Sequence, residues 1–249
     1  ARQAGDRRDE AWCLNSLGYT CDSRGEKEQA LAWSAQCLPL WRELEDRQGE
    51  GVTLNNMAAI YWRQGRYEQA LETYQQSLSI RQEVGDRTGE GTILNNIATV
   101  YYHQGDYEQA VQYYEQCLPI RQEAGDKIGE GTTLNNIAAI YDAQEKPDRA
   151  VEYYKQSLAI HRELGDRAGE AITCWNIGLT YEDMGDLAKA EEHIRLAVEI
   201  EEAIDSPNLE DSRKGLERVR AMRREVRPSQ RQKGISAFWN WLKRKRQGA

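Results

Sequence analysis

A 40-residue period runs through this chain of 249 residues and restricts its fold more than any other feature of the sequence. Glutamate returns in the same register in each copy, at Glu10, Glu50, Glu90, Glu130, Glu170 and Glu210. A chain with such a period folds as a row of similar units, each packed only on its neighbours. The composition agrees, because a mean hydropathy of −0.83 leaves little apolar material for one central core.

Each period contains two stretches with the 3.6-residue spacing of an α-helix, which we name helix A and helix B. In the third copy the apolar stripe of helix A comprises Leu94, Ile97, Ala98 and Tyr101. The stripe of helix B comprises Ala110, Tyr114, Cys117, Leu118 and Ile120. Glycine separates the two stretches at Gly65, Gly105 and Gly185, where a left-handed residue ends helix A.

Gly-Asp pairs at 85–86, 125–126 and 165–166 mark the joints between units, since Gly ends one helix and Asp caps the next. Pro39 and Pro119 fall inside helix B and predict a bend there rather than a helix end. Small residues fill one further column of helix B, at Cys37, Ser77, Cys117, Ser157 and Ala197. The five cysteines are therefore predicted to be reduced core residues, not disulfide, zinc or catalytic residues.

These residues resemble the tetratricopeptide repeat (TPR) motif. The resemblance rests on Leu-x-x-Ile/Leu-Ala/Gly-x-x-Tyr in helix A, Gly-x-Tyr-x-x-Ala at the turn and Tyr-x-x-Ser/Ala-Leu in helix B. The 40-residue length is similar to that in kinesin light chains, spindle-orientation adaptors and bacterial TPR arrays joined to CHAT or NTPase modules. One departure is Glu145-Lys146-Pro147, which replaces Gly-Asp-Tyr. The resemblance implies an all-α fold, a right-handed α-solenoid of antiparallel helix hairpins.

We expect five units over residues 6–204, with residues 1–5 as the end of a preceding repeat. A capping helix is expected over 205–227, because Leu209, Leu216, Val219, Met222 and Val226 continue a helical stripe. Residues 228–249 form a basic, aromatic tail. Since the chain starts within a repeat and without Met, we expect more repeats or another domain before it.

In TPR arrays helix A lines the concave face, so the resemblance implies that its polar residues bind a ligand. Asparagines form two columns there. The first contains Asn15, Asn55, Asn95 and Asn135, and the second contains Asn56, Asn96, Asn136 and Asn176. An amide offers both donors and an acceptor, which matches a peptide backbone. The second column is the expected ligand contact by analogy with the family. The alternative is that some asparagines only bridge neighbouring helices or bind water.

The next helical turn adds charge and aromatic surface to the same face. Its middle is predicted to be aromatic and basic, through Trp62, Arg63, Tyr102 and His103. Its C-terminal part is predicted to be acidic, through Asp142, Glu182 and Asp183. A ligand with an acidic or aromatic end and a basic end is complementary to this gradient.

The sequence contains no pattern that indicates an enzyme, a cofactor or a metal site. The three histidines, His103, His161 and His193, lie in different columns, without HExxH, and each is predicted to be a solvated helix residue. A nucleophile elbow and a phosphate-binding GxxxxGK[ST] are also missing. Neither a signal peptide nor a run of 18 apolar residues is present, so we expect a soluble cytoplasmic protein.

From Ser212 onward the charge reverses, with 13 Lys and Arg against two acids. Near the end, large aromatic and basic residues adjoin, and the expected contacts are Phe238, Trp239, Trp241, Lys243 and Arg244. Such a segment can dock in a protein groove, including one in its own chain, and less readily on nucleic acid or an anionic membrane.

Three functions remain open from the sequence. The first is a non-enzymatic scaffold or adaptor that binds an extended peptide or a partner domain in the Asn-lined groove. The second is a structural protein whose open-ended repeats self-assemble into oligomers or filaments. The third is a nucleic-acid or membrane tether that acts through the tail.

Overall fold

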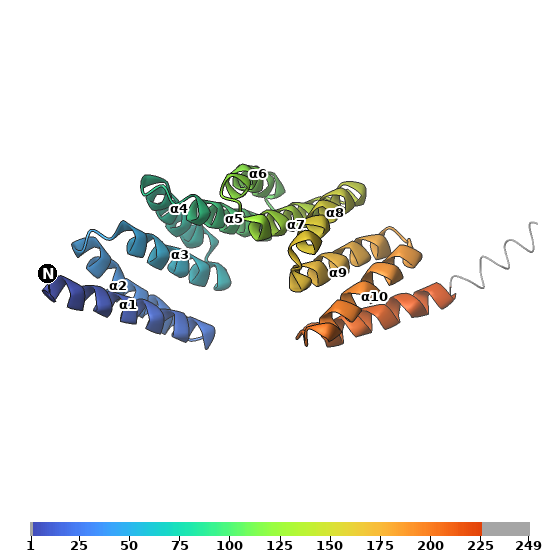
Figure 1. Cartoon of the computed structure of the whole chain (residues 1–249), viewed down its shortest axis with the longest axis horizontal. Helices are drawn as coiled ribbons and strands as arrows, with labels where there is room; N and C mark the ends of the chain where they lie inside the picture. Colours follow the sequence, from blue (N-terminus) through green and yellow to red (C-terminus); the bar gives the residue numbers. More distant parts are fainter. Residues whose placement is uncertain (1, 226–249) are drawn as a thin grey trace, which may run out of the picture. The chain divides into compact units, whose positions relative to one another are not determined.

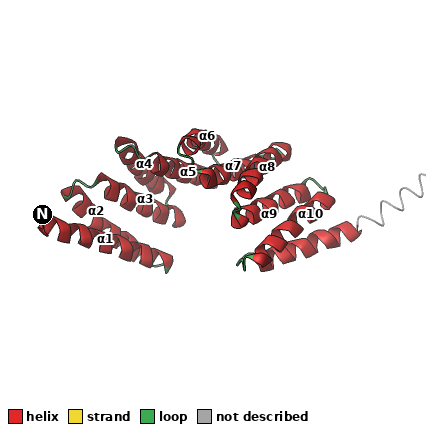
Figure 2. Cartoon of the chain, viewed as in Figure 1, coloured by secondary structure: helices red, strands yellow, loops and turns green. Residues whose placement is uncertain are grey.

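The computed structural model describes the backbone of residues 2–225 and side chains from residue 6 onward (Figure 1). Within this range the chain forms helices joined by short turns and no strand (Figure 2). The labelled helices are α1 (Arg2–Ser23), α2 (Lys27–Glu43), α3 (Arg47–Arg63), α4 (Tyr67–Glu83), α5 (Arg87–Gln104), α6 (Tyr107–Glu123), α7 (Lys127–Ala143), α8 (Pro147–Leu164), α9 (Arg167–Asp183) and α10 (Leu187–Ala203). A further helix covers residues 209–225. The all-α solenoid predicted from the period is confirmed.

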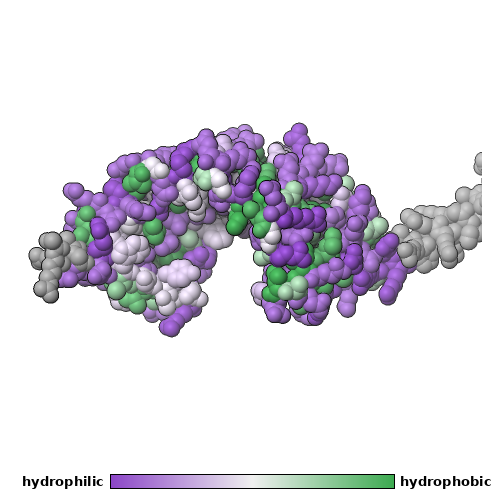
Figure 3. Space-filling model, in the orientation of Figure 1, coloured by the Kyte–Doolittle hydropathy of each residue, from purple (hydrophilic) through white to green (hydrophobic). Residues whose placement is uncertain are grey.

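The chain divides into two compact units, residues 1–133 and 134–249. In the first unit α1 packs on α2, α3 on α4 and α5 on α6, and α2–α3 and α4–α5 contacts join successive hairpins. The A helices also contact each other directly, α1 with α3 and α3 with α5. In the second unit α9 packs between α8 and α10. On the drawn face of each unit, apolar patches lie among mostly hydrophilic side chains (Figure 3).

The predicted turn glycines adopt the left-handed conformation that ends helix A. Their φ angles are 72° at Gly65, 78° at Gly105 and 76° at Gly185. At the turn between α7 and α8 the same conformation falls on Glu145, with φ 57°. A side chain makes this conformation costly, so the departure from the family pattern at 145–147 places local strain there.

The helix caps between successive 40-residue repeats also follow the prediction. Each capping Asp accepts a hydrogen bond from the backbone N–H three residues later, at 2.8 to 3.0 Å; the pairs are Asp46–Gly49, Asp86–Gly89, Asp126–Gly129 and Asp166–Gly169. These bonds satisfy an N–H that the first turn of a helix leaves without a partner. Pro39 and Pro119 lie inside α2 and α6 and end neither helix.

The joints contain a second polar contact that the sequence analysis did not anticipate. A basic side chain near the end of helix B bonds the capping Asp of the next helix A; the pairs are Arg81 Nη1–Asp86 Oδ2 at 2.5 Å, Arg121 Nη1–Asp126 Oδ2 at 2.9 Å and His161 Nδ1–Asp166 Oδ2 at 2.8 Å. The expectation that each histidine is solvated is therefore wrong for His161, which is buried in this joint.

The burial of three cysteines confirms most of the cysteine prediction. Cys37, Cys117 and Cys174 are completely buried. Cys13 is exposed, so its assignment to the core was wrong. The residues at the same position as Cys13 in later repeats are buried because the preceding hairpin covers them. One of them is Thr53, which bonds Trp41 of α2. No described helix precedes α1 to cover Cys13.

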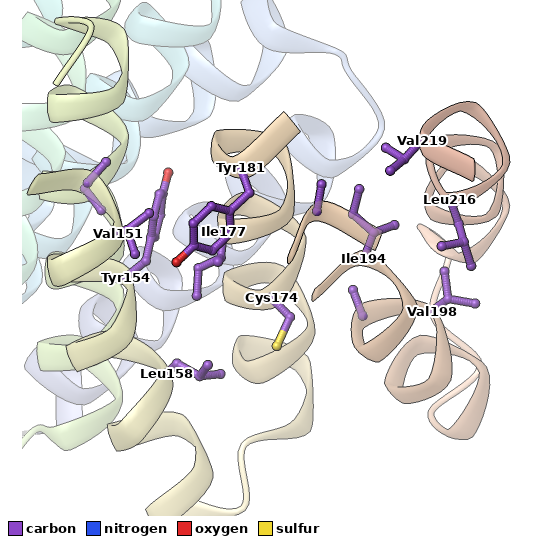
Figure 4. Packing of buried hydrophobic residues seen from close by; sticks show 14 residues of the cluster. Val151, Tyr154, Leu158, Cys174, Ile177, Tyr181, Ile194, Val198, Leu216 and Val219 are labelled. Carbon is purple, nitrogen blue, oxygen red and sulfur yellow. The ribbon is translucent and has the colours of Figure 1, made fainter. Parts of the chain in front are cut away.

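The helix over 209–225 packs on α10 in the second unit. Leu216 and Val219 are buried with Ile194 and Val198 of α10 (Figure 4). Met222, expected in the same stripe, is exposed, because at this turn Arg223 faces α10 and bonds Glu191 at 2.5 Å. Val226 lies outside the described residues.

Candidate functional site

The asparagines of the A helices form hydrogen-bonded steps between successive repeats, which we call the amide ladder. In the first unit Asn96 Nδ2 donates to Asn55 Oδ1 at 3.1 Å. Asn56 Nδ2 donates more weakly to Asn15 Oδ1, at 3.5 Å. Each bond joins the second column to the first column of the preceding repeat. The structure thus gives these amides the bridging role that the sequence analysis left as an alternative.

The second unit repeats this step, since Asn176 Nδ2 of α9 donates to Asn135 Oδ1 of α7 at 3.2 Å. The eight predicted asparagines are all half-buried: Asn15, Asn55, Asn56, Asn95, Asn96, Asn135, Asn136 and Asn176. An amide has two N–H groups and two acceptor lone pairs. Because a ladder step uses one N–H of the donor and one lone pair of the acceptor, the ladder leaves hydrogen-bonding capacity on a face that solvent reaches.

A small cavity of about 120 Å³ opens on this face between α1 and α3. Its wall comprises Asn15, Gly18, Tyr19, Asp22, Ser34, Asn56, Ala59, Ile60 and Arg63. Arg63 Nη2 donates to Asp22 Oδ2, which makes an ion pair across the two A helices. The other carboxylate oxygen, Asp22 Oδ1, is buried and has no hydrogen-bond partner within the described chain. The cavity therefore contains an acceptor that an N–H donor of a ligand would satisfy.

The aromatic residues predicted for the middle of the face lie together at the ends of α3 and α5. The ring centroids of Trp62 and His103 are 5.4 Å apart, as are those of His103 and Tyr102. Tyr107 of α6 extends the group, with its centroid 5.8 Å from that of Tyr102. Trp62 and Tyr102 are half-buried and His103 is exposed. Flat surfaces of this kind suit an aromatic or cationic side chain of a peptide.

The acids predicted for the C-terminal part of the face lie in the second unit and are partly compensated. Glu182 accepts two hydrogen bonds from Arg218, at 2.8 and 2.9 Å. Asp142 bonds Thr180 of α9, and burial raises the pKa of Asp142, with repulsion by Asp183 as a further cause. Asp183 itself is exposed. The negative charge of this part is thus carried chiefly by Asp142 and Asp183.

Models of the tetratricopeptide repeat match this chain over residues 11–47, 49–123 and 129–203. The chain belongs to the tetratricopeptide repeat family. No curated protein matched it in sequence. The resemblance drawn from the repeated residues is thus confirmed, and repeats of this family typically act as protein-interaction modules.

Several solved structures match the chain over most of its length. BtubC from P. vanneervenii is 24% identical with a TM-score of 0.67, and the match covers 82% of this chain and 91% of BtubC. A STAND ATPase with a TPR sensor, from Pyrococcus horikoshii, is 18% identical with a TM-score of 0.74, and the match covers 87% of this chain and 34% of that one. A putative kinesin light chain from P. anserina is 17% identical with a TM-score of 0.62 and coverages of 76% and 93%.

Asp22 was not among the residues predicted for this face, although the period contained the signal. Asp22 lies 40 residues before Trp62 and 80 before Tyr102, both of which were predicted for the face. Reading the column back by one more repeat would have included it. That its carboxylate pairs with Arg63 was not predictable, because the pairing depends on how closely α1 and α3 approach.

The described part of this TPR chain provides no metal site, since no group of three potential metal-ligating side chains occurs there. Burial raises the pKa of the Cys174 thiol to about 11 and also raises that of Cys37. A thiol with a raised pKa stays protonated at neutral pH and is a poor nucleophile. Within residues 2–225 no helix is long and apolar enough to cross a membrane.

The predicted tail contacts, Phe238, Trp239, Trp241, Lys243 and Arg244, lie outside the described residues. Their expected role in contacting a protein, nucleic acid or a membrane stays a prediction.

Proposed function

We propose that this TPR chain is a non-enzymatic, cytoplasmic scaffold that binds an extended segment of another protein along its A-helix face. The observation that supports this most directly is the cavity between α1 and α3, where Asp22 Oδ1 is buried without a partner beside Asn15, Asn56 and Arg63. An extended peptide presents N–H and C=O groups in alternation, and this cavity offers acceptors and donors together.

The amide ladder extends this chemistry along the A helices. The steps hold the half-buried asparagines in fixed positions, which lowers the entropy that binding has to remove. The capacity that the ladder leaves unused can then meet a peptide backbone without a charge on the ligand. The bridging role and the ligand role are compatible, because one amide can fill both.

Side chains on each unit select the ligand. In the first unit the Trp62, Tyr102 and His103 cluster is suited to an aromatic or cationic side chain, while Arg63 is already paired with Asp22. In the second unit Asp142 and Asp183 favour a basic segment. The two parts of the predicted gradient thus lie on different units, and each unit prefers a different segment of the ligand.

The test is selection of peptides from a random display library on the full chain, followed by titration of the selected peptides. Asp22→Asn and the pair Asn56→Ala with Asn96→Ala should each weaken binding about tenfold, or roughly 1.4 kcal/mol. The matched control replaces exposed amides of the B helices, Gln75→Ala with Gln112→Ala, and should leave the affinity unchanged. Loss of binding in the control, with binding retained in the A-helix variants, would place the ligand elsewhere.

A second candidate function is self-association through α1. This helix exposes Trp12, Leu17 and Tyr19, by 48%, 44% and 69% of their surfaces. The residue that corresponds to Leu17 two repeats later, Ile97, is completely buried. Light scattering across protein concentration distinguishes this candidate: an oligomer that Leu17→Glu dissociates supports it, and a monomer at all concentrations contradicts it.

A further inference from the structure

One column of side chains near the end of helix B changes its chemistry at the last joint. The column comprises Trp41, Arg81, Arg121, His161 and Glu201. At the three joints before the last one, the basic member bonds a capping Asp, as in the 2.5 Å bond between Arg81 and Asp86. At the last joint the basic residue is replaced by Glu201 and the capping Asp by Ser206. At the Arg81 and Arg121 joints this column supplies a cation to the capping Asp, whereas the last joint has an acid in the same place.

The next helix also begins later at the last joint than at the others. α9 begins at Arg167, so the period places the start of the next helix at 207, yet that helix begins at 209. A pocket of about 260 Å³ lies at this point, beside the turn after α10. Apolar side chains form much of its wall, including Ala168, Ala171, Ile172, Ile204 and Pro207.

Glu201 lines this pocket and is only 3% exposed. Its Oε2 is buried and has no hydrogen-bond partner within the described residues. A buried carboxylate oxygen without a partner is costly, and a cation that enters beside it removes that cost. Ile172 and Ile204 of the pocket wall are 46% and 38% exposed, so solvent reaches apolar side chains at the rim of the pocket.

We propose that this Glu201 pocket binds the cationic end of a lysine or arginine side chain. The alkyl stem lies against Ile172 and Ile204, and the charge pairs with Glu201 in the place that a basic residue of the chain itself occupies at earlier joints. The wall also contains the polar residues Asp205, Ser206 and Asn208. A bare metal ion needs several oxygen ligands, and the described residues contain no group of three acidic, histidine or cysteine side chains that could hold one.

Two sources can supply this side chain: the chain's own Lys243 to Arg246, or a basic segment of another protein. The chain's own tail is long enough to reach the Glu201 pocket. The 18 residues from 226 to 243 span up to roughly 60 Å when extended, whereas the 17-residue helix before them is about 25 Å long. The chemistry of the site is the same for either source.

The experiment follows the δ1-methyl signals of Ile172 and Ile204 by NMR in the full chain, with buried Ile140 as a remote reference. The probe is Nα-acetyl-lysine methylamide, and the matched neutral probe is Nα-acetyl-norleucine methylamide. One variant is Glu201→Gln, which keeps the size of the side chain. A second variant replaces Lys243, Arg244, Lys245 and Arg246 by Gln in the full-length chain.

We expect saturable shifts of the Ile172 and Ile204 methyl signals with the lysine probe and not with the norleucine probe. Glu201→Gln should weaken the lysine probe at least tenfold. Tighter binding in the four-Gln variant than in the unaltered chain identifies the tail as the natural occupant. Equal binding excludes Lys243 to Arg246 and leaves a basic side chain of another protein as the occupant. Equal shifts with both probes, no shift in either chain, or unchanged binding by Glu201→Gln would overturn the proposal. The comparison of the two probes needs no variant to fold.

Discussion

Asn96 of α5 donates its Nδ2–H to Oδ1 of Asn55 in α3 at 3.1 Å, and these residues are 41 positions apart, one more than the period. The extra residue means that each step of the amide ladder runs between different columns. A substitution in one repeat therefore changes the partner of a residue in the preceding repeat.

A double-mutant cycle measures the energy of this step. Asn96→Ala and Asn55→Ala should each lower the free energy of unfolding by about 1 kcal/mol, since the bond is half-buried. The double variant should lose less than the sum, with a coupling of roughly 0.5 to 1 kcal/mol. Chemical denaturation gives all four values. Strict additivity would show that the bond contributes nothing to stability.

Gly178→Ala should destabilise the second unit, because a Cβ added there would lie 2.5 Å from Ile194 Cγ1 and 3.2 Å from the Ile194 backbone nitrogen. The expected cost is about 1 to 3 kcal/mol. Gly18→Ala in the same column is the matched control, since its nearest contact is Ser34 Oγ at 3.3 Å. Thermal unfolding compares the two variants. An equal loss in both would disprove the steric explanation.

Glu145→Gly should stabilise the chain by about 1 kcal/mol, because Glu145 has a φ of 57° that Gly adopts without a Cβ penalty. The reverse change, Gly105→Ala at φ 78°, should destabilise by a similar amount. Denaturation midpoints report both effects. A lower midpoint for Glu145→Gly would mean that the Glu side chain compensates for the strain.

Acid should weaken the second unit through His193. Burial lowers the pKa of His193 below its usual 6.5, and its Nδ1 has no hydrogen-bond partner within the described chain. The unfolded chain then takes up the proton more readily than the folded one. The His193 contribution is present above about pH 6.5 and is lost as the pH falls through the lower folded pKa.

The free energy of unfolding, measured by denaturant between pH 7.5 and 5.5, checks this sign. The unaltered chain should lose stability on acidification, and His193→Gln should lose less over the same range. A His193 pKa above 6.5 in an NMR titration would contradict the prediction.

The fold followed from the sequence because its determinants are local and repeated. Gly105 and Asp86 define a helix end and a helix start within a few residues, and each signal returns 40 residues later. The contacts between helices were less predictable. The period gave the two asparagine columns, but the offset of the ladder depends on how the A helices lie against each other.

The wrong or missing predictions also arise from contacts between helices, which the sequence does not show directly. Cys13 belongs to a buried column, yet burial depends on the preceding hairpin, which the column alone does not supply. His161 looked like an isolated surface histidine because its partner Asp166 lies beyond the end of α8, at the cap of the next helix. Asp22 belongs to the ligand-facing column, and only the structure shows that one of its oxygens lacks a partner.

The side chains at the joints also determine which repeats are interchangeable. Arg81 and Arg121 make the same contact with Asp86 and Asp126, so excising residues 82–121 reconnects chemically equal surfaces and shortens the row by one hairpin. Trp41, His161 and Glu201 differ from these and from each other. Gain or loss of a repeat is thus easiest between the Arg81 and Arg121 joints, while the joints at Trp41, His161 and Glu201 favour one order of their hairpins.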